Sequence, residues 1–122
     1  MKRLSLFIYF VLITVLQAAA QQSFDKTAVK SVMKRVADWQ IANPNKGAEH
    51  DDLDWTHAAL YMGMLDWAEL TEKEDSDDSY YQWLLRIGQR NHFQIGKWMY
   101  HADFIAVGQP FIDLYLKYGN KK

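Results

Sequence analysis

The sequence contains no cysteine, two prolines and six glycines among its 122 residues. Without cysteine the chain has no disulfide to hold its fold and no reactive thiol. The glycines form no phosphate-binding loop of the known spacing. Positive charge is not in excess either, with 14 Lys and Arg against 15 Asp and Glu. Because proteins that bind nucleic acid usually carry a basic surface, we expect no nucleic-acid partner.

Metal-binding patterns are also missing. The four histidines include no pair four residues apart on one expected helix, the spacing that binds zinc in many helical sites. His101 and Asp103 lie close in sequence, but two ligands are too few for a metal site. No Ser/His/Asp constellation stands out. We therefore expect no metal.

Residues 1–20 have the layout of a secretory signal peptide. Lys2 and Arg3 precede an apolar run over residues 4–16, and residues 18–20 are three alanines suited to cleavage. The run is too short for an ordinary transmembrane helix. We expect a mature chain of residues 21–122 that is periplasmic or secreted, without stable membrane insertion. An uncleaved membrane anchor or a buried N-terminal helix is the alternative.

Apolar residues in the mature part recur at helical spacing, and few stretches alternate with a period of two. Asp25 is placed to cap a first helix, and Pro44 to end it. The polar run at residues 72–78 is expected to end a second helix, and residues 91–99 to be irregular. Pro110 is expected to kink the last helix or to mark its true first turn. The sequence thus predicts an all-α fold of antiparallel helix hairpins, with helices over residues 25–42, 55–71, 80–90 and 102–118.

The apolar stripes predict which side chains pack inside. Trp39, Trp67 and Trp83 recur with aliphatic residues and are expected in the core. Trp55 and Trp98 lie at a helix start and in a loop, where packing and a ligand surface are equally consistent with the pattern. The other residues expected to face inward are Val29, Val32, Val36, Ala58, Ala59, Tyr61, Met62, Leu65, Tyr80, Leu84, Ile87, Phe111, Leu114, Tyr115 and Tyr118.

The most suggestive polar groups lie at the start of the last expected helix. His101 and Asp103 stand there beside Trp98 and Tyr100. Aromatic rings stack on the apolar faces of sugars, and glycoside chemistry relies on carboxyl groups. Each residue also has a structural explanation, because an acid at a helix start is stabilised by free N–H groups and a histidine there can cap or pack. The acids at positions 51, 52, 54 and 75–78 are expected to be solvated.

Three segments, in this order, carry a family resemblance. They are Val36-Ala37-Asp38-Trp39-Gln40, then Asp54-Trp55-Thr56-His57-Ala58-Ala59-Leu60-Tyr61-Met62-Gly63, then Tyr100-His101-Ala102-Asp103 with Val107-Gly108-Gln109. Together they resemble the N-terminal part of the unsaturated rhamnogalacturonyl hydrolases and of their relatives, the unsaturated glucuronyl hydrolases (glycoside hydrolase families 105 and 88). The resemblance spans residues 29–118.

The resemblance implies an (α/α)6 barrel of six helix hairpins, of which residues 21–122 would be an N-terminal fragment. It implies release of a 4,5-unsaturated uronic acid from lyase-generated oligosaccharides, such as those of pectin, by hydration of the double bond and without a cofactor. By position, Trp55 resembles the tryptophan of the pocket wall, and Asp103 the aspartate that contacts sugar hydroxyls and assists the catalytic acid. His101 lines the same entrance, flanked by Trp98 and Tyr100.

The sequence departs from the family pattern in two ways. Phe104 stands where many relatives carry a second acid directly after the first. The stretch resembling Asp-Ala-Leu-Phe-Met-Ala-Pro, which carries the family's principal catalytic aspartate, does not occur, so we expect the 122-residue chain alone to be inactive. Two other functions stay open: a small exported α-helical module that binds without catalysis, and a structural homo-oligomer.

Overall fold

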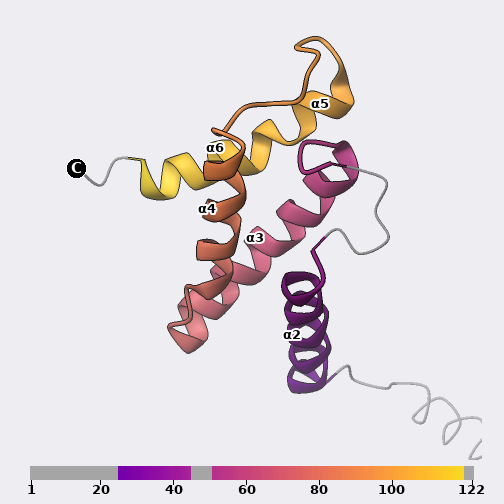
Figure 1. Cartoon of the computed structure of the whole chain (residues 1–122). Coiled ribbons are helices and arrows are strands. Elements are labelled where there is room, and N and C mark those ends of the chain that lie inside the picture. Colours follow the sequence, from indigo (N-terminus) through magenta and orange to yellow (C-terminus); the bar gives the residue numbers. More distant parts are fainter. Residues whose placement is uncertain (1–24, 45–50, 120–122) are drawn as a thin grey trace, which may run out of the picture. The chain divides into compact units, whose positions relative to one another are not determined.

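A computed structural model describes residues 25–44 and 51–119 of the chain (Figure 1). These two stretches contain helices and loops but no strand, which confirms the all-α prediction. No helix within them has the length and apolar character needed to cross a membrane. The predicted signal peptide lies outside the described residues. The helices are α2 (Lys26–Ala42), α3 (Trp55–Asp75), α4 (Ser79–Arg90), α5 (Ala102–Ala106) and α6 (Gly108–Tyr118).

The chain divides into two compact units, Met1–Val32 and Met33–Lys122. The described residues of the first unit, 25–32, form the beginning of α2. There the carboxylate of Asp25 accepts a hydrogen bond from the backbone N–H of Thr27 at 3.0 Å, which is the predicted helix cap. The rest of α2 and all other helices belong to the second unit.

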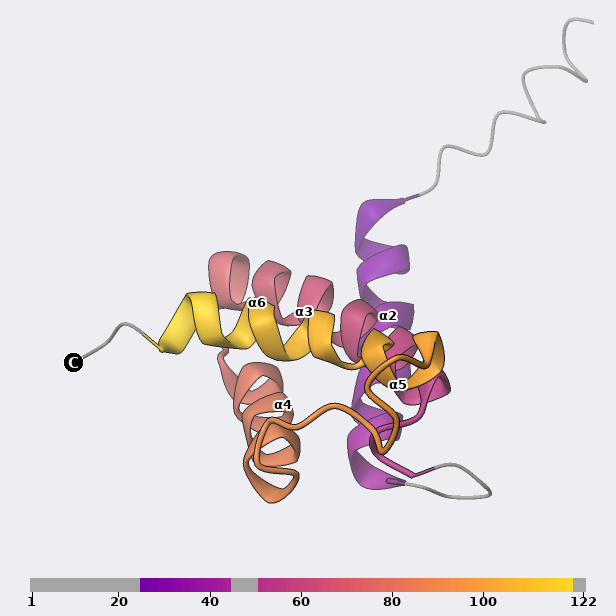
Figure 2. The ribbon, with the colours of Figure 1, turned by 90° about the horizontal axis from the view of Figure 1, so that it is seen from above.

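The core of the second unit lies where α3, α4 and α6 pack against one another (Figure 2). Its side chains recur every three or four residues along each helix, so that each helix turns one apolar face inward. Trp67 is buried and Trp83 is partly buried against the core, in agreement with the prediction. The buried apolar residues are Ala37, Ala58, Tyr61, Met64, Leu65, Trp67, Ala68, Tyr80, Tyr81, Leu84, Ile87, Val107, Phe111 and Leu114.

The predicted end of the second helix, at Thr71, is wrong, because α3 continues to Asp75. Glu and Lys, which follow Thr71, favour the helical backbone despite their polarity. The helix ends where Ser76 adopts the left-handed conformation, with a φ of 56°, and donates its N–H to the carbonyl of Thr71. The extra turn is held by an ion pair between Glu72 and Lys117 of α6.

The predicted inward stripe of α2 is also wrong. Trp39 is 51% exposed, and Val29, Val32 and Val36 are exposed as well. The opposite face of α2 points toward the core: Ala37 is buried, and the neighbouring Asp38 carboxylate accepts a hydrogen bond from the hydroxyl of Tyr80 at 2.7 Å. The inward side of α2 therefore carries a buried alanine and a polar contact with α4, and not the aliphatic stripe.

The last predicted helix is two helices that meet at the buried Val107. Pro110 lies in the first turn of α6, as predicted, where its missing N–H costs no helical hydrogen bond. On α6, Phe111 and Leu114 are buried and Tyr118 is partly buried. Tyr115 is exposed, contrary to the prediction, because it lies one position beyond Leu114 and so turns away from the core. On α3, Trp55 and Ala59 are exposed for the same reason, since the buried face runs through Ala58 and Tyr61.

We expect the substitution Gly63→Ala to raise the free energy of unfolding by about 0.5–1 kcal/mol. Gly63 lies inside α3, and a Cβ atom built there meets nothing within 4 Å. Urea denaturation measures the change. Gly96→Ala is the matched control of opposite sign, because a Cβ there would lie 1.9 Å from Cδ1 of Phe104. Destabilisation by Gly63→Ala would contradict the open space seen at this position.

Candidate functional site

Three aromatic rings gather at the start of α5. The imidazole of His101 lies 5.8 Å from the ring of Trp98 and 5.4 Å from that of Phe104, between ring centroids. Trp98 and Phe104 meet edge to face at 5.7 Å. The backbone supports this ring cluster, since the N–H of Gly96 donates to the carbonyl of Phe104 at 3.2 Å. The cluster fixes the orientation of the imidazole without using it as a helix cap.

Asp103 lies beside the ring cluster. Its Oδ2 is 3.7 Å from Nδ1 of His101, a distance that allows an ion pair when the imidazole is protonated but is too long for a hydrogen bond. The Asp103 side chain is 54% exposed. Its carboxylate therefore remains open to the hydroxyl groups of a ligand. The structure thus brings together three of the predicted site residues: Trp98, His101 and Asp103.

The two other predicted site residues, Tyr100 and Trp55, lie outside this cluster of ring contacts. Tyr100 is 95% exposed. Trp55 is the exposed first residue of α3, a helix that begins where the carboxylate of Asp54 accepts a hydrogen bond from the N–H of Thr56. The beginning of α3 lies beside α5 in both views (Figures 1 and 2). Trp55 is thus carried by a neighbouring element, and no ring contact within the described residues joins it to the cluster.

Phe104 has a packing role that its place in the sequence did not reveal. Its ring is half-buried over Gly96, where no side chain fits, because a Cβ at Gly96 would lie 1.9 Å from the ring. The ring also contacts Trp98 and His101. An acid at this position would be turned into the packed side of the turn. Asp103 is consequently the single carboxylate of the cluster.

Sequence reasoning missed a second polar group, centred on Asp52. The prediction that this acid is solvated is wrong, because its side chain is 15% exposed. Asp52 accepts hydrogen bonds from Nε and Nη2 of Arg90 at 2.6 and 2.7 Å, and from Nδ2 of Asn91 at 2.9 Å. Burial alone would raise the pKa of Asp52, but the hydrogen bonds from Arg90 and Asn91 outweigh it and hold the pKa below its usual value.

Two further acids, Asp54 and Asp77, have local structural roles at the starts of helices. Asp54 caps α3, as described above. Asp77 accepts a hydrogen bond from the N–H of Ser79 at 2.9 Å, at the start of α4. Hydrogen bonding with the Ser79 side chain, and then with its backbone N–H, lowers the pKa of Asp77. Both acids follow the familiar rule for residues before a helix, so the sequence signal was present.

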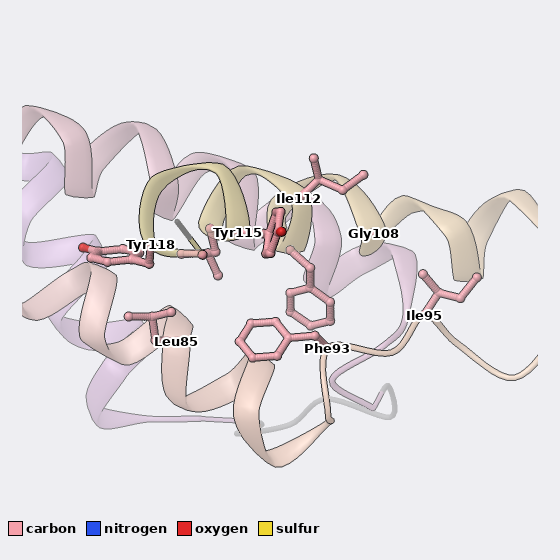
Figure 3. Close-up of a pocket in the computed structure, with 10 residues that line it drawn as sticks. Leu85, Phe93, Ile95, Gly108, Ile112, Tyr115 and Tyr118 are labelled. Carbon is pink, nitrogen blue, oxygen red and sulfur yellow. The ribbon is translucent and has the colours of Figure 1, made fainter. Parts of the chain in front are cut away.

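A large pocket in the described part of the chain lies away from these polar groups, between the end of α4 and α6 (Figure 3). Its walls are apolar and include Leu85, Phe93, Ile95, Phe111, Ile112 and Tyr115. It offers no carboxylate, imidazole or amine for acid–base chemistry. Within residues 25–44 and 51–119, no three His, Asp or Glu side chains converge as metal ligands.

The comparison with known proteins gives one match. The family model for Glycosyl Hydrolase Family 88 matches residues 24–122, a stretch that contains both α3 and the ring cluster. No curated protein and no solved structure matches the chain.

Proposed function

The chain belongs to Glycosyl Hydrolase Family 88, and on that premise we propose that it serves the release of a 4,5-unsaturated uronic acid from lyase-generated oligosaccharides. The proposed activity is of the unsaturated rhamnogalacturonyl or glucuronyl hydrolase type, with pectin fragments as one source of substrate. One observation carries the proposal. The exposed carboxylate of Asp103 lies beside the imidazole of His101, which in turn contacts the ring of Trp98. Family membership favours this function over a binding module without catalysis.

The proposed reaction adds water across the double bond of the terminal sugar. A proton goes to C4 and the hydroxyl group goes to C5, which also carries the ring oxygen. The resulting hemiketal opens, and C1 then releases the remaining oligosaccharide as an alcohol. Such chemistry needs a carboxyl group that gives and takes a proton, and groups that hold the sugar.

Each residue of the site has a proposed task. Asp103 accepts hydrogen bonds from sugar hydroxyls and assists the acid that protonates C4. Nδ1 of His101 lies 3.7 Å from Oδ2 of Asp103, so the imidazole borders the carboxylate where the sugar would bind. Trp98 and Tyr100 are exposed rings that stack against sugar faces, and Trp55 supplies the neighbouring wall.

The proposal extends to the whole fold and to the place of action. The packed helices α3, α4 and α6 are consistent with an (α/α)6 barrel of six hairpins. The N-terminal layout of residues 1–20 supports export, and hence action on extracellular or periplasmic oligosaccharides. No metal or organic cofactor enters the proposed reaction.

We expect an unsaturated galacturonyl disaccharide to raise the midpoint of thermal unfolding, measured by circular dichroism. At a concentration of about 100 times Kd, binding would add about 2.7 kcal/mol to the free energy of unfolding. Asp103→Asn should reduce the affinity roughly tenfold or more, because a hydrogen bond to a charged group is lost. Its unfolding midpoint without sugar should stay unchanged, since Asp103 is exposed.

Asp66→Asn is the matched control, because Asp66 is an exposed carboxylate of α3 away from the ring cluster. It should leave both the midpoint and the sugar effect unchanged. Hydration of the unsaturated disaccharide is measured in a separate assay, as the loss of the ultraviolet absorbance of its conjugated double bond. Equal stabilisation by a saturated galacturonyl disaccharide, or an undiminished effect in Asp103→Asn, would overturn the proposed site.

A further inference from the structure

A narrow crevice opens beside Asp52, apart from the ring cluster. It lies between the end of α2, the first turns of α3, and α4. Its polar lining consists of Gln40 and four titratable side chains, Asp52, His57, Tyr61 and Arg90. An open depression adjoins it, sharing Asp52 and Arg90 and adding Asp51, Leu53 and Asn91. The two hollows form a continuous polar surface that the proposed function does not use.

One polar atom in the crevice is buried without a partner. Nδ1 of His57 makes no hydrogen bond to any other described residue. Tyr61, a residue that is 2% exposed, lines the same crevice. A buried polar group left unpaired is destabilising, so Nδ1 of His57 indicates a site that something fills.

The chemistry of the crevice suits a hydroxyl group. Burial raises the pKa of Tyr61, so that its phenol stays a hydrogen-bond donor at ordinary pH. Nδ1 of a neutral His57 accepts a hydrogen bond, as does the Asp52 carboxylate, while Arg90 donates. The edge-to-face pair of Tyr61 and Trp83, with centroids 6.0 Å apart, adds an aromatic wall. A hydroxyl both donates and accepts, and therefore satisfies groups of both kinds.

The charge of the surrounding surface selects among ligands with hydroxyl groups. Two carboxylates, Asp51 and Asp52, face one guanidinium, Arg90, which is already paired with Asp52 through two hydrogen bonds. The remaining charge is negative, and it repels an anion. A uronate is therefore disfavoured here, whereas a neutral sugar is not.

We propose that the crevice and the adjoining depression form a second carbohydrate site, which binds a neutral sugar through a hydroxyl group inserted between Tyr61 and His57. The choice of a sugar as the source of that hydroxyl rests on membership of a glycoside hydrolase family. This choice is independent of the proposal that the unsaturated uronic acid binds beside Asp103. The site holds a part of an oligosaccharide other than its terminal unsaturated uronic acid.

The first test compares D-galactose with D-galacturonate, which differ at C6, where the uronate carries a carboxylate in place of a hydroxymethyl group. The full chain, labelled with ¹⁵N, is titrated with each sugar, and the indole N–H signal of Trp83 is followed by NMR and assigned with Trp83→Phe. We expect galactose to shift this signal, and galacturonate to bind at least about tenfold more weakly. An unmoved Trp83 signal, or equal affinity for the two sugars, would overturn the proposal.

The second test removes the Tyr61 hydroxyl alone. Tyr61→Phe should weaken galactose binding about three- to tenfold, as expected for one lost hydrogen bond between neutral groups. Tyr81→Phe is the control, because Tyr81 is an equally buried tyrosine of α4 that does not line the crevice. Unchanged affinity in folded Tyr61→Phe would reject the site.

A third variant separates the two proposals. Asp103→Asn should leave galactose binding at Trp83 unchanged while it weakens binding of the unsaturated disaccharide. Parallel loss of both in Asp103→Asn would show one site instead of two, and would overturn this inference while leaving the proposed function in place.

Discussion

Leu84→Ala is expected to lower the free energy of unfolding by about 2–5 kcal/mol. Leu84 is among the most deeply buried side chains of the core, on the face of α4 that packs against α3 and α6. Truncation removes apolar contacts and leaves a cavity that rigid helices fill only in part. Because small domains are stable by about 5–15 kcal/mol, a loss of this size is a large fraction of the total.

Urea denaturation at neutral pH measures this loss, and Leu116→Ala provides the matched control. Leu116 carries the same side chain on α6 but is exposed. Its truncation should change the free energy of unfolding by about 0.5 kcal/mol or less. Similar losses in the two variants would mean that α3, α4 and α6 do not share the core described above.

The sequence predicted the helices of this core well, because helix packing leaves a local signature. Tyr80, Leu84 and Ile87 recur at intervals of three and four, and all three are buried. The same reasoning failed for α2, where Trp39 is exposed. Periodicity tells that a helix has an apolar face, but it does not tell what covers that face. In α2 the inward side instead carries Ala37 and Asp38, whose carboxylate accepts a hydrogen bond from Tyr80, 42 positions away.

The candidate sites also differ in how far apart their residues lie in the sequence, and this decides whether they could be predicted. Trp98, His101 and Asp103 lie within six positions of one another, so their proximity was predictable from the sequence. Asp52 and Arg90 are 38 positions apart, and no spacing rule links them. Asp52 also stands in an acidic stretch that is typical of a solvated loop. Only the packing of α3 against α4 brings the pair together.

The Asp52–Arg90 pair leads to the second large effect. We expect Asp52→Asn to lower the free energy of unfolding at pH 7 by about 1–3 kcal/mol. The asparagine has nearly the same shape, so no cavity forms. It offers one acceptor oxygen in place of two and turns an amide toward the guanidinium of Arg90. The 15% exposure of the Asp52 side chain keeps water from replacing the lost bonds fully.

The pH dependence of this loss distinguishes the lost charge from a general packing defect. The pKa of Asp52 is lower in the folded chain than in the unfolded chain, where an aspartate titrates near about 3.9. Its stabilising contribution is therefore complete above the unfolded pKa and disappears as the pH falls through the folded pKa. Urea denaturation at pH 7 and at about pH 3 should show the difference between the parent chain and Asp52→Asn shrinking at the lower pH.

The neighbouring carboxylate supplies the control for this experiment. Asp51 is exposed, and its Oδ1 accepts a hydrogen bond from the N–H of Leu53 at 2.8 Å, which an asparagine oxygen preserves. Asp51→Asn removes the same charge from the same loop, so it should change the free energy of unfolding by about 0.5 kcal/mol or less. If both variants lower the free energy of unfolding equally at pH 7, the loss comes from the change in net charge of the loop. A loss in Asp52→Asn alone that fades in acid assigns it to the bonds with Arg90 and Asn91, because those bonds are the contacts that protonation of Asp52 weakens.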